Sequence, residues 1–163
     1  MSVFFINQQN AYNCYEYINE NGGKRIEKLE KFIAQDAYYS YLYAFSIIKG
    51  EFPLGEDIIA RDSQMNFNYI FNVIKKPFAR GEDSISKNPH QSYEYARDIL
   101  KGRFEKGEQT IIKFPTLAIL YAKDVIKGRF AEAERNIFDN YWSRTEYQKM
   151  IKERLESGVP IKH

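Results

Sequence analysis

Apolar residues recur at intervals of three and four along most of the chain. Two clear runs are Tyr93, Ala96, Ile99 and Leu100, and Ile119, Ala122, Val125 and Ile126. These intervals place an apolar stripe on one face of an α-helix that is about 20 Å long. β-Branched runs such as Thr110-Ile111-Ile112 fall inside the same helical frame. The pattern therefore predicts an all-α protein without strands.

The helical pattern repeats every 26 residues. Segments 43–52, 95–104 and 121–130 align without gaps, and segment 69–78 is a degenerate copy. Extending the frame gives six repeats, at residues 8–33, 34–59, 60–85, 86–111, 112–137 and 138–163. Three columns support this frame: tyrosines (Tyr17, Tyr43, Tyr69, Tyr95, Tyr121, Tyr147), glutamates (Glu30, Glu56, Glu82, Glu108, Glu134) and isoleucines (Ile33, Ile59, Ile85, Ile111, Ile137). A short period of this kind is typical of stacked repeat proteins.

Each repeat carries the signals of a helical hairpin. One column holds residues that favour a helix N-cap, namely Asn10, Asp36, Asp62, Asn88 and Asn140, and only Phe114 departs from it. The first helix is expected to end at Gly50, Gly102 and Gly128, in the left-handed cap position after a lysine. A shorter second helix follows, with Pro53 in its first turn. We therefore predict an α-solenoid of about six 26-residue helical hairpins, forming a single domain over residues 1–163.

The first and last repeats depart from the pattern as capping repeats should. In the first, Gly22-Gly23 is expected to end the helix early, and residues 1–7 form an apolar tail short enough to lie across the first hairpin. In the last, Gly158-Val159-Pro160 is expected to end the second helix.

The run Tyr-Ala-x-x-(Ile/Val)-(Ile/Leu)-Lys-Gly-Arg-Phe resembles short tandem helical repeats that recur in bacteriophage proteins of mostly unknown function. The resemblance covers about residues 34–137 and is strongest over residues 93–137, whereas Lys76, Pro77 and the last repeat depart from it. It implies a virus-encoded protein that acts in the host bacterial cytoplasm. It carries no catalytic residue over to this chain, because the matching motif is structural.

Composition excludes several classes of function. The chain has 163 residues, with 24 Lys and Arg against 22 Asp and Glu, so its net charge of +2 does not indicate an acidic tail or a polybasic arm. The single cysteine, Cys14, excludes an intrachain disulfide and a multi-cysteine zinc site. No segment has the length and apolarity of a membrane span, and the first residues lack the pattern of a signal peptide. We expect a soluble cytoplasmic protein.

The titratable residues favour a structural interpretation over a catalytic one. A catalytic site is singular, whereas the glutamate column recurs once per repeat, so we expect these carboxylates to accept hydrogen bonds or to pair with a nearby Lys or Arg. A hydrogen bond from a buried tyrosine to such a glutamate would satisfy both groups. Cys14 is expected in the core and His90 in solvent, and no motif ties His90 or His163 to Cys14 as its base. We expect no catalytic residue, no metal site and no cofactor.

The outer face of the first helices varies between repeats while the core columns do not. It runs through Tyr38, Leu42, Phe45 and Lys49, then Gln64, Asn68, Phe71 and Lys75, then His90, Glu94, Arg97 and Lys101, then Thr116, Leu120, Lys123 and Lys127. Repeat proteins commonly bind partners through such a variable face. The candidate partner-binding residues are Tyr38, Leu42, Phe45, Lys49, Phe71, Lys75, Arg97, Lys101, Lys123 and Lys127. An alternative interpretation is that Phe45 and Phe71 only fill grooves between repeats.

These observations predict a non-enzymatic repeat protein that engages a host or viral protein and inhibits or modulates it, as in host modulation or anti-defence. The competing hypothesis is an RNA- or DNA-binding repeat protein that uses a ladder of Lys49, Lys75, Lys101 and Lys127 with Arg103 and Arg129. A third hypothesis is an enzyme with its site at a junction between repeats. No membrane partner is expected.

Overall fold

The computed structural model describes residues 3–158, and side chains from residue 9 onward. Over this part of the chain the secondary structure is helical and contains no strand, which confirms the predicted all-α class. Within the same residues, no helix combines the length and apolarity that crossing a bilayer requires. Internal contacts divide the chain into two compact units, Met1–Ser84 and Ile85–His163, one residue before the predicted end of the third repeat.

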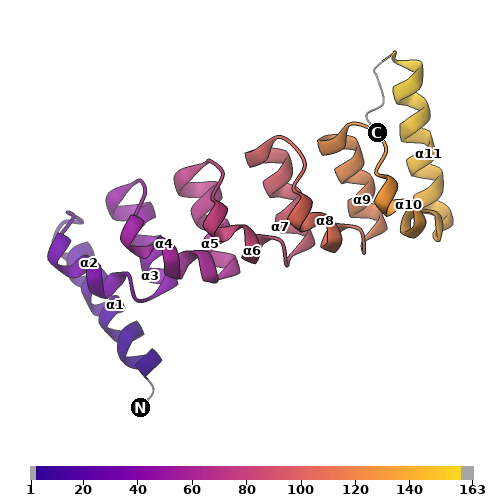
Figure 1. Ribbon diagram of the computed structural model, residues 1–163. Helices are drawn as coiled ribbons and strands as arrows, with labels where there is room; N and C mark the ends of the chain where they lie inside the picture. The colour runs from indigo at the N-terminus through magenta and orange to yellow at the C-terminus, as the bar shows by residue number, and fades with distance from the viewer. Residues whose placement is uncertain (1–2, 159–163) are drawn as a thin grey trace. The chain divides into compact units, whose positions relative to one another are not determined.

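The N-terminal unit begins with a long helix, α1 (Val3–Glu20), packed against α2 (Glu27–Ile33). Two first helices follow, each an α-helix that continues into a π-helical turn: α3 (Ala37–Leu42) with η1 (Tyr43–Ile48), and α5 (Ser63–Tyr69) with η3 (Ile70–Ile74). Their second helices are η2 (Pro53–Gly55) with α4 (Glu56–Arg61), and η4 (Ala79–Gly81) with α6 (Glu82–Ile85). The first helices α3 and α5 lie side by side, and α4 packs against both (Figure 1).

The C-terminal unit follows the same plan. Its first helices are α7 (Pro89–Glu94) with η5 (Tyr95–Leu100), and α9 (Pro115–Tyr121) with η6 (Ala122–Ile126). Its second helices are α8 (Glu105–Ile111) and α10 (Ala131–Phe138), and α11 (Tyr141–Glu156) closes the unit. The helices α7, α9 and α11 lie side by side, so the outer face that varies between repeats is continuous across them (Figure 1).

Four of the five predicted N-caps are confirmed. The side chains of Asp36, Asp62, Asn88 and Asn140 each accept a hydrogen bond from a backbone N–H in the first turn of the following helix. Phe114 makes no such bond, because its side chain has no hydrogen-bond acceptor. The prediction for Asn10 is wrong, because this residue lies inside α1, which runs unbroken from Val3. Gly22 and Gly23 end this helix in left-handed conformations, as expected.

The first helices end differently from the prediction. The left-handed residue is the lysine and not the glycine: Lys49, Lys75, Lys101 and Lys127 have φ angles of 55°, 50°, 51° and 57°. The N–H groups of Lys49 and Gly50 both donate to the carbonyl of Ala44, which widens the last turn to a π-helical one. The glycine that follows therefore needs no positive φ. Lys76 occupies the glycine column of the third repeat and the turn still forms.

The predicted core columns are buried. Every isoleucine of the column from Ile33 to Ile137 is fully buried, and so are the tyrosines from Tyr43 to Tyr147. The prediction for Tyr17 is wrong, since 55% of this residue is exposed. In α1 the buried face runs through Ala11, Tyr15 and Ile18 instead.

At four places a hydrogen-bonded tyrosine ties a repeat to the one before it, and we call this contact the repeat junction. The hydroxyl of Tyr121 donates to Glu108 Oε1 at 2.8 Å and accepts the backbone N–H of Phe104 at 2.7 Å. Tyr69 makes the same two bonds, to Glu56 and from Phe52. The pairs Tyr43–Glu30 and Tyr147–Glu134 repeat the first of them, at 3.0 and 3.1 Å. The expected tyrosine-to-glutamate bond is confirmed at these four junctions.

An arginine neutralises the glutamate at each of these junctions. Arg25, Arg103 and Arg129 pair with the glutamate five residues later, whereas Glu56 receives Arg80 from the next repeat. Hydrogen bonds from Arg129 and Tyr147 hold the pKa of Glu134 below its usual value. Burial of the ring, with the adjacent carboxylate, raises the pKa of Tyr43 to about 12. The carboxylates are therefore occupied by structural contacts.

Glycines allow close packing of the two helices within a repeat. A Cβ at Gly107 would lie 2.6 Å from Ser92 Cβ and 2.6 Å from the Phe104 ring, and one at Gly55 would meet Ser40 at 2.8 Å. Neither position has room for a side chain. The two helices of a repeat therefore approach each other closely at these glycines.

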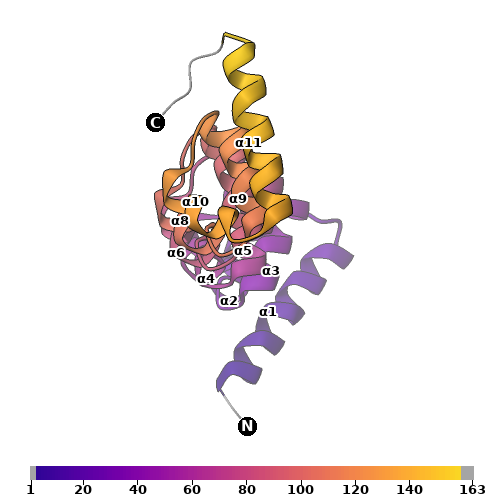
Figure 2. The same cartoon turned by 90° about the vertical axis from the view of Figure 1, so that its right-hand side faces the viewer.

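The last repeat differs from a hairpin over its described residues. Only one helix, α11, spans residues 141–156, and Figure 2 shows it as a single uninterrupted helix. Glu156 stands where the earlier repeats bury a phenylalanine, so no apolar group there favours leaving the helix. Gly158, with a φ of 69°, follows its end, while Val159 and Pro160 of the predicted stop lie outside the described residues.

Candidate functional site

The predicted partner-binding residues all reach the surface. In the N-terminal unit they are Tyr38, Leu42, Phe45, Lys49, Phe71 and Lys75, of which Leu42 and Phe71 are half-buried and the others exposed. In the C-terminal unit they are Arg97, Lys101, Lys123 and Lys127, all exposed. Each unit therefore presents its own part of the face, which is aromatic in the first and basic in the second.

The aromatic residues of the N-terminal unit pack on their own helices. Phe45 is 50% exposed and stacks on Tyr41 with ring centroids 5.8 Å apart. The ring centroids of Phe71 and Phe67 are 4.3 Å apart. Tyr38 is 48% exposed and meets the edge of Tyr39 at 5.2 Å. Phe45 and Tyr38 therefore leave about half of their surface in solvent.

A second set of bonds joins neighbouring first helices on the outer face, and we call these the outer bridges. Each connects residues 31 apart: Tyr15 with Ser46 at 3.1 Å, Asn72 with Tyr41 at 3.3 Å, and Tyr93 with Asp124 at 2.5 Å. Sequence analysis did not predict them. The Tyr93 bridge also includes Arg97, whose guanidinium donates to the Tyr93 hydroxyl at 3.1 Å.

Arg97 is consequently held in place and is not a free cation. Its guanidinium pairs with Asp98 at 2.6 Å and lies over the Tyr93 ring, 4.8 Å from the centroid. Hydrogen bonds from Arg97 hold the pKa of Asp98 below its usual value. Among the predicted candidates, this residue is the one most committed to contacts within its own unit.

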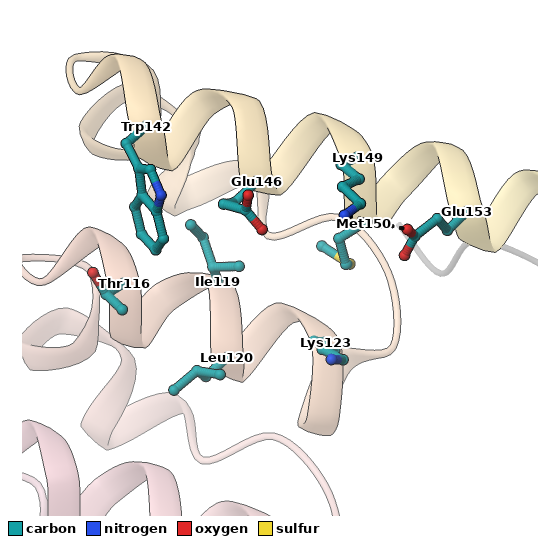
Figure 3. Close-up of a pocket in the computed structure, with 9 residues that line it drawn as sticks. All are labelled: Thr116, Ile119, Leu120, Lys123, Trp142, Glu146, Lys149, Met150 and Glu153. Atoms are coloured by element: carbon teal, nitrogen blue, oxygen red, sulfur yellow. Dashed lines mark ion pairs between the residues drawn. The ribbon is translucent and has the colours of Figure 1, made fainter.

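The outer bridge is replaced by apolar side chains between α9 and α11. Ile119 and Met150 occupy the two positions that are 31 residues apart, and both line an open groove with a cavity of about 290 Å³. Trp142 closes one end of this groove, above Thr116, and Leu120 and Lys123 line its lower side (Figure 3). Along α11, Glu146, Lys149 and Glu153 follow Trp142 toward the other end (Figure 3). We call this feature the α9–α11 groove.

A second cavity of about 310 Å³ lies between α7 and α9. It is lined by His90, Tyr93, Glu94, Phe114, Pro115, Thr116, Leu117 and Leu120. Thr116 and Leu120 also line the α9–α11 groove, so the two cavities adjoin across α9. Phe114 is 50% exposed at this place, where four of the other repeats have a polar N-cap residue. The outer face of the C-terminal unit thus carries adjoining apolar hollows.

Sequence analysis missed the residues that α11 contributes to the groove. Adding one period of 26 to Thr116, Leu120, Lys123 and Lys127 gives Trp142, Glu146, Lys149 and Glu153, and all four line it. The signal was therefore present in the period. The departures of the last repeat from the other columns predict only a cap.

The four lysines of the predicted basic ladder are exposed, and no ion pair of their side chains occurs among the described residues. The two arginines of the ladder are not available in the same way. Arg103 pairs with Glu108 and Glu132, at 2.7 and 3.2 Å, and Arg129 pairs with Glu134 at 2.6 Å. The ladder is therefore limited to lysines.

Residues 3–158 hold no cluster of His, Cys, Asp and Glu that could bind a metal ion. Cys14 is half-buried, and burial raises the pKa of its thiol, which disfavours the thiolate that a nucleophile needs. His90 is exposed as predicted, and His163 lies outside the described residues. The outer face presents apolar and charged side chains.

Comparison with known protein families, with curated proteins and with solved structures gives no match.

Proposed function

We propose that this protein is a non-enzymatic helical-repeat binding protein that engages another protein through the outer face of its first helices. The observation that carries the proposal is the α9–α11 groove with Trp142 at its end, where 57% of the residue is exposed. Tryptophan is among the residues that dominate binding energy when a partner buries them. An apolar hollow with charged sides is also typical of a recognition site.

The resemblance of the repeats to bacteriophage tandem repeats supports a virus-encoded origin. In that setting the partner is a host or viral protein in the bacterial cytoplasm, and binding would inhibit or modulate it. The contacts of the glutamate column support a non-catalytic role, because these carboxylates form hydrogen bonds and ion pairs at the repeat junctions.

Nucleic-acid binding is the second candidate function, and the four exposed lysines favour it. Non-specific binding of this kind draws most of its affinity from contacts between basic residues and phosphates. The pairing of Arg103 and Arg129 with glutamates reduces the cations available, and the net charge is only +2. Protein binding therefore remains the stronger proposal.

Affinity capture from bacterial lysate with the full chain tests the proposal. The decisive comparison is between Trp142→Ala, which removes the exposed ring from the groove, and Tyr141→Ala, which removes a neighbouring ring that is 82% exposed but does not line it. We expect wild type and Tyr141→Ala to retain the same stoichiometric protein at low and high salt, and Trp142→Ala to lose it. Retention of nucleic acid alone, released by salt, would overturn the proposal.

A further inference from the structure

We propose that the α9–α11 groove binds an amphipathic α-helix of the partner, apolar on the side that enters the groove and acidic toward its C-terminal end. This inference rests on the proposed function, since it names the chemistry of a protein partner at the same face.

The groove lies where a hydrogen bond that joins two neighbouring first helices elsewhere in the unit has no counterpart. Between α7 and α9, the bond from Tyr93 to Asp124 joins the two helices across their outer face. Between α9 and α11, the equivalent positions are Ile119 and Met150, which can make no such bond. Ile119 and Met150 line the open channel between the two helices together with Leu120 and Trp142, and an apolar strip of a ligand can contact these four side chains.

The backbone of the groove selects a helix over an extended peptide. A bound strand takes its affinity from unpaired backbone groups at a sheet edge. Here both walls are helices, whose backbone N–H and carbonyl groups are bonded within the helix. Recognition must instead come from side chains, and a helix lying between two helices with an apolar stripe at i, i+4 and i+7 satisfies this condition.

The length of the groove fits a helix of about four turns. A second cavity of about 230 Å³ shares Lys123, Met150 and Glu153 with the first and extends along α11 to Ser157. Trp142 and Ser157 thus mark the two ends, and the intervening part of α11 rises about 22 Å. A bound helix of about 15 residues matches this distance.

Charge is distributed unevenly along the groove and fixes the polarity of the ligand. The Trp142 end carries one carboxylate, Glu146 (Figure 3). The far end carries three cations, Lys123, Lys149 and Arg154, against the single carboxylate of Glu153.

The single carboxylate at the far end compensates only one of these cations. Glu153 pairs with Lys149 at 4.0 Å, and Arg154 is held by a bond to the carbonyl of Lys127 at 2.6 Å. Acidic side chains and the negative end of a helix dipole therefore interact most favourably with this positive end of the groove. The partner helix consequently runs in the same direction as α11, with its C-terminal turn beside Lys123.

The same features disfavour a nucleic-acid strand in this groove. Trp142 could stack on a base, but Glu146 and Glu153 would repel the phosphates that accompany it. A bound oligonucleotide is therefore the competing outcome that the experiment must detect.

Trp142 is the sole tryptophan of the chain, so its fluorescence reports on the groove alone. The probe is a synthetic helical peptide of about 15 residues with leucines at i, i+4, i+7 and i+11, lysines in its first turn and glutamates in its last. A matched peptide has the same composition with the lysines and glutamates exchanged. Both are titrated into the full chain.

We expect the acidic-end peptide to shift Trp142 emission to shorter wavelength and to saturate with a Kd on the order of 10 μM. The exchanged peptide should bind about tenfold more weakly. The double variant Lys123→Glu with Lys149→Glu should reverse this preference, while Lys152→Glu should preserve it, because Lys152 is exposed on α11 but does not line the groove. Circular dichroism confirms that each variant remains helical.

Equal affinities for the two peptides, or no shift with either, would overturn the inference. An oligonucleotide that shifts Trp142 emission at the same concentrations would overturn it as well. These failures are distinguishable from failure of the proposed function: if the peptides do not bind but capture of a protein still depends on Trp142, the helix hypothesis alone is wrong. If capture is also insensitive to Trp142→Ala, both are wrong.

Discussion

Removal of one hydroxyl group from a repeat junction should have a large effect on stability. Tyr121 is fully buried, and its hydroxyl is both a donor to Glu108 and an acceptor from the backbone N–H of Phe104. In Tyr121→Phe the ring remains, so packing of the aromatic core changes little. The substitution isolates the two hydrogen bonds.

The expected loss follows from what remains unpaired. The N–H of Phe104 becomes a buried donor without its acceptor, which costs about 1–3 kcal/mol. Glu108 keeps two bonds from Arg103, at 2.8 and 2.7 Å, so it loses only one of its charge-assisted bonds, worth about 1.5–3 kcal/mol. Since the two terms share one group they are not additive, and we expect a total of about 3 kcal/mol. For a chain of this length the melting temperature should fall by about 6–12 °C.

The assay is urea and thermal unfolding followed by far-UV circular dichroism. Tyr17→Phe is the matched control, because it makes the same chemical change in the same sequence column at a residue that is 55% exposed. We expect the control to change the free energy of unfolding by less than about 0.5 kcal/mol. Equal effects of the two substitutions would refute the role assigned to the junction hydroxyl.

Three further predictions concern the glycines, the left-handed lysines and alkaline pH. Gly107→Ala should lower the free energy of unfolding by about 1–3 kcal/mol, because the new Cβ would lie 2.6 Å from Ser92. In the same denaturation assay Gly102→Ala should be close to neutral, because the nearest atom to its new Cβ is 3.8 Å away. Lys101→Gly should raise the melting temperature, because glycine adopts the left-handed conformation at φ 51° without the strain of about 1 kcal/mol that a lysine has there. A lower melting temperature would contradict this prediction. Burial raises the pKa values of Tyr43 and Tyr147 from 10 to about 12. The contribution of these residues to stability is therefore complete below pH 10 and is lost as the pH rises through about 12. In a pH titration, the loss of helicity and the rise in tyrosinate absorbance should occur together.

Much of the fold follows from the sequence because one period carries several independent signals. The N-cap column, the buried isoleucines and the tyrosine-to-glutamate bond each depend on residue type at a fixed position, and Asp62, Ile111 and Tyr121 behave as predicted. The first repeat does not follow these predictions, because Asn10 and Tyr17 match the residue types of their columns without taking the same structural positions. An unbroken α1 places both of them on its exposed face.

The error at the helix ends has a physical origin. A Lys-Gly pair after a helix is normally interpreted with glycine in the left-handed position, because glycine adopts it without steric cost. The π-helical turn moves the requirement back by one residue, onto Lys101 and its equivalents. Lys76 carried the information, since the third repeat has no glycine at that column and must end its helix without one.

The candidate site was harder to predict than the fold because it depends on how neighbouring helices are offset. The period places Trp142 and Glu146 on the outer face, and extending it by one repeat would have found them. The outer bridges link residues 31 apart, five more than the period, and that extra offset is set by packing between helices. Once the offset is known, the pair Ile119 and Met150 marks one place where the side chains cannot form the bridge, as Phe67 marks another. Variation at these two positions therefore separates a polar pair, which joins α7 to α9 by a hydrogen bond, from an apolar pair, which lines the groove where we propose that a partner binds.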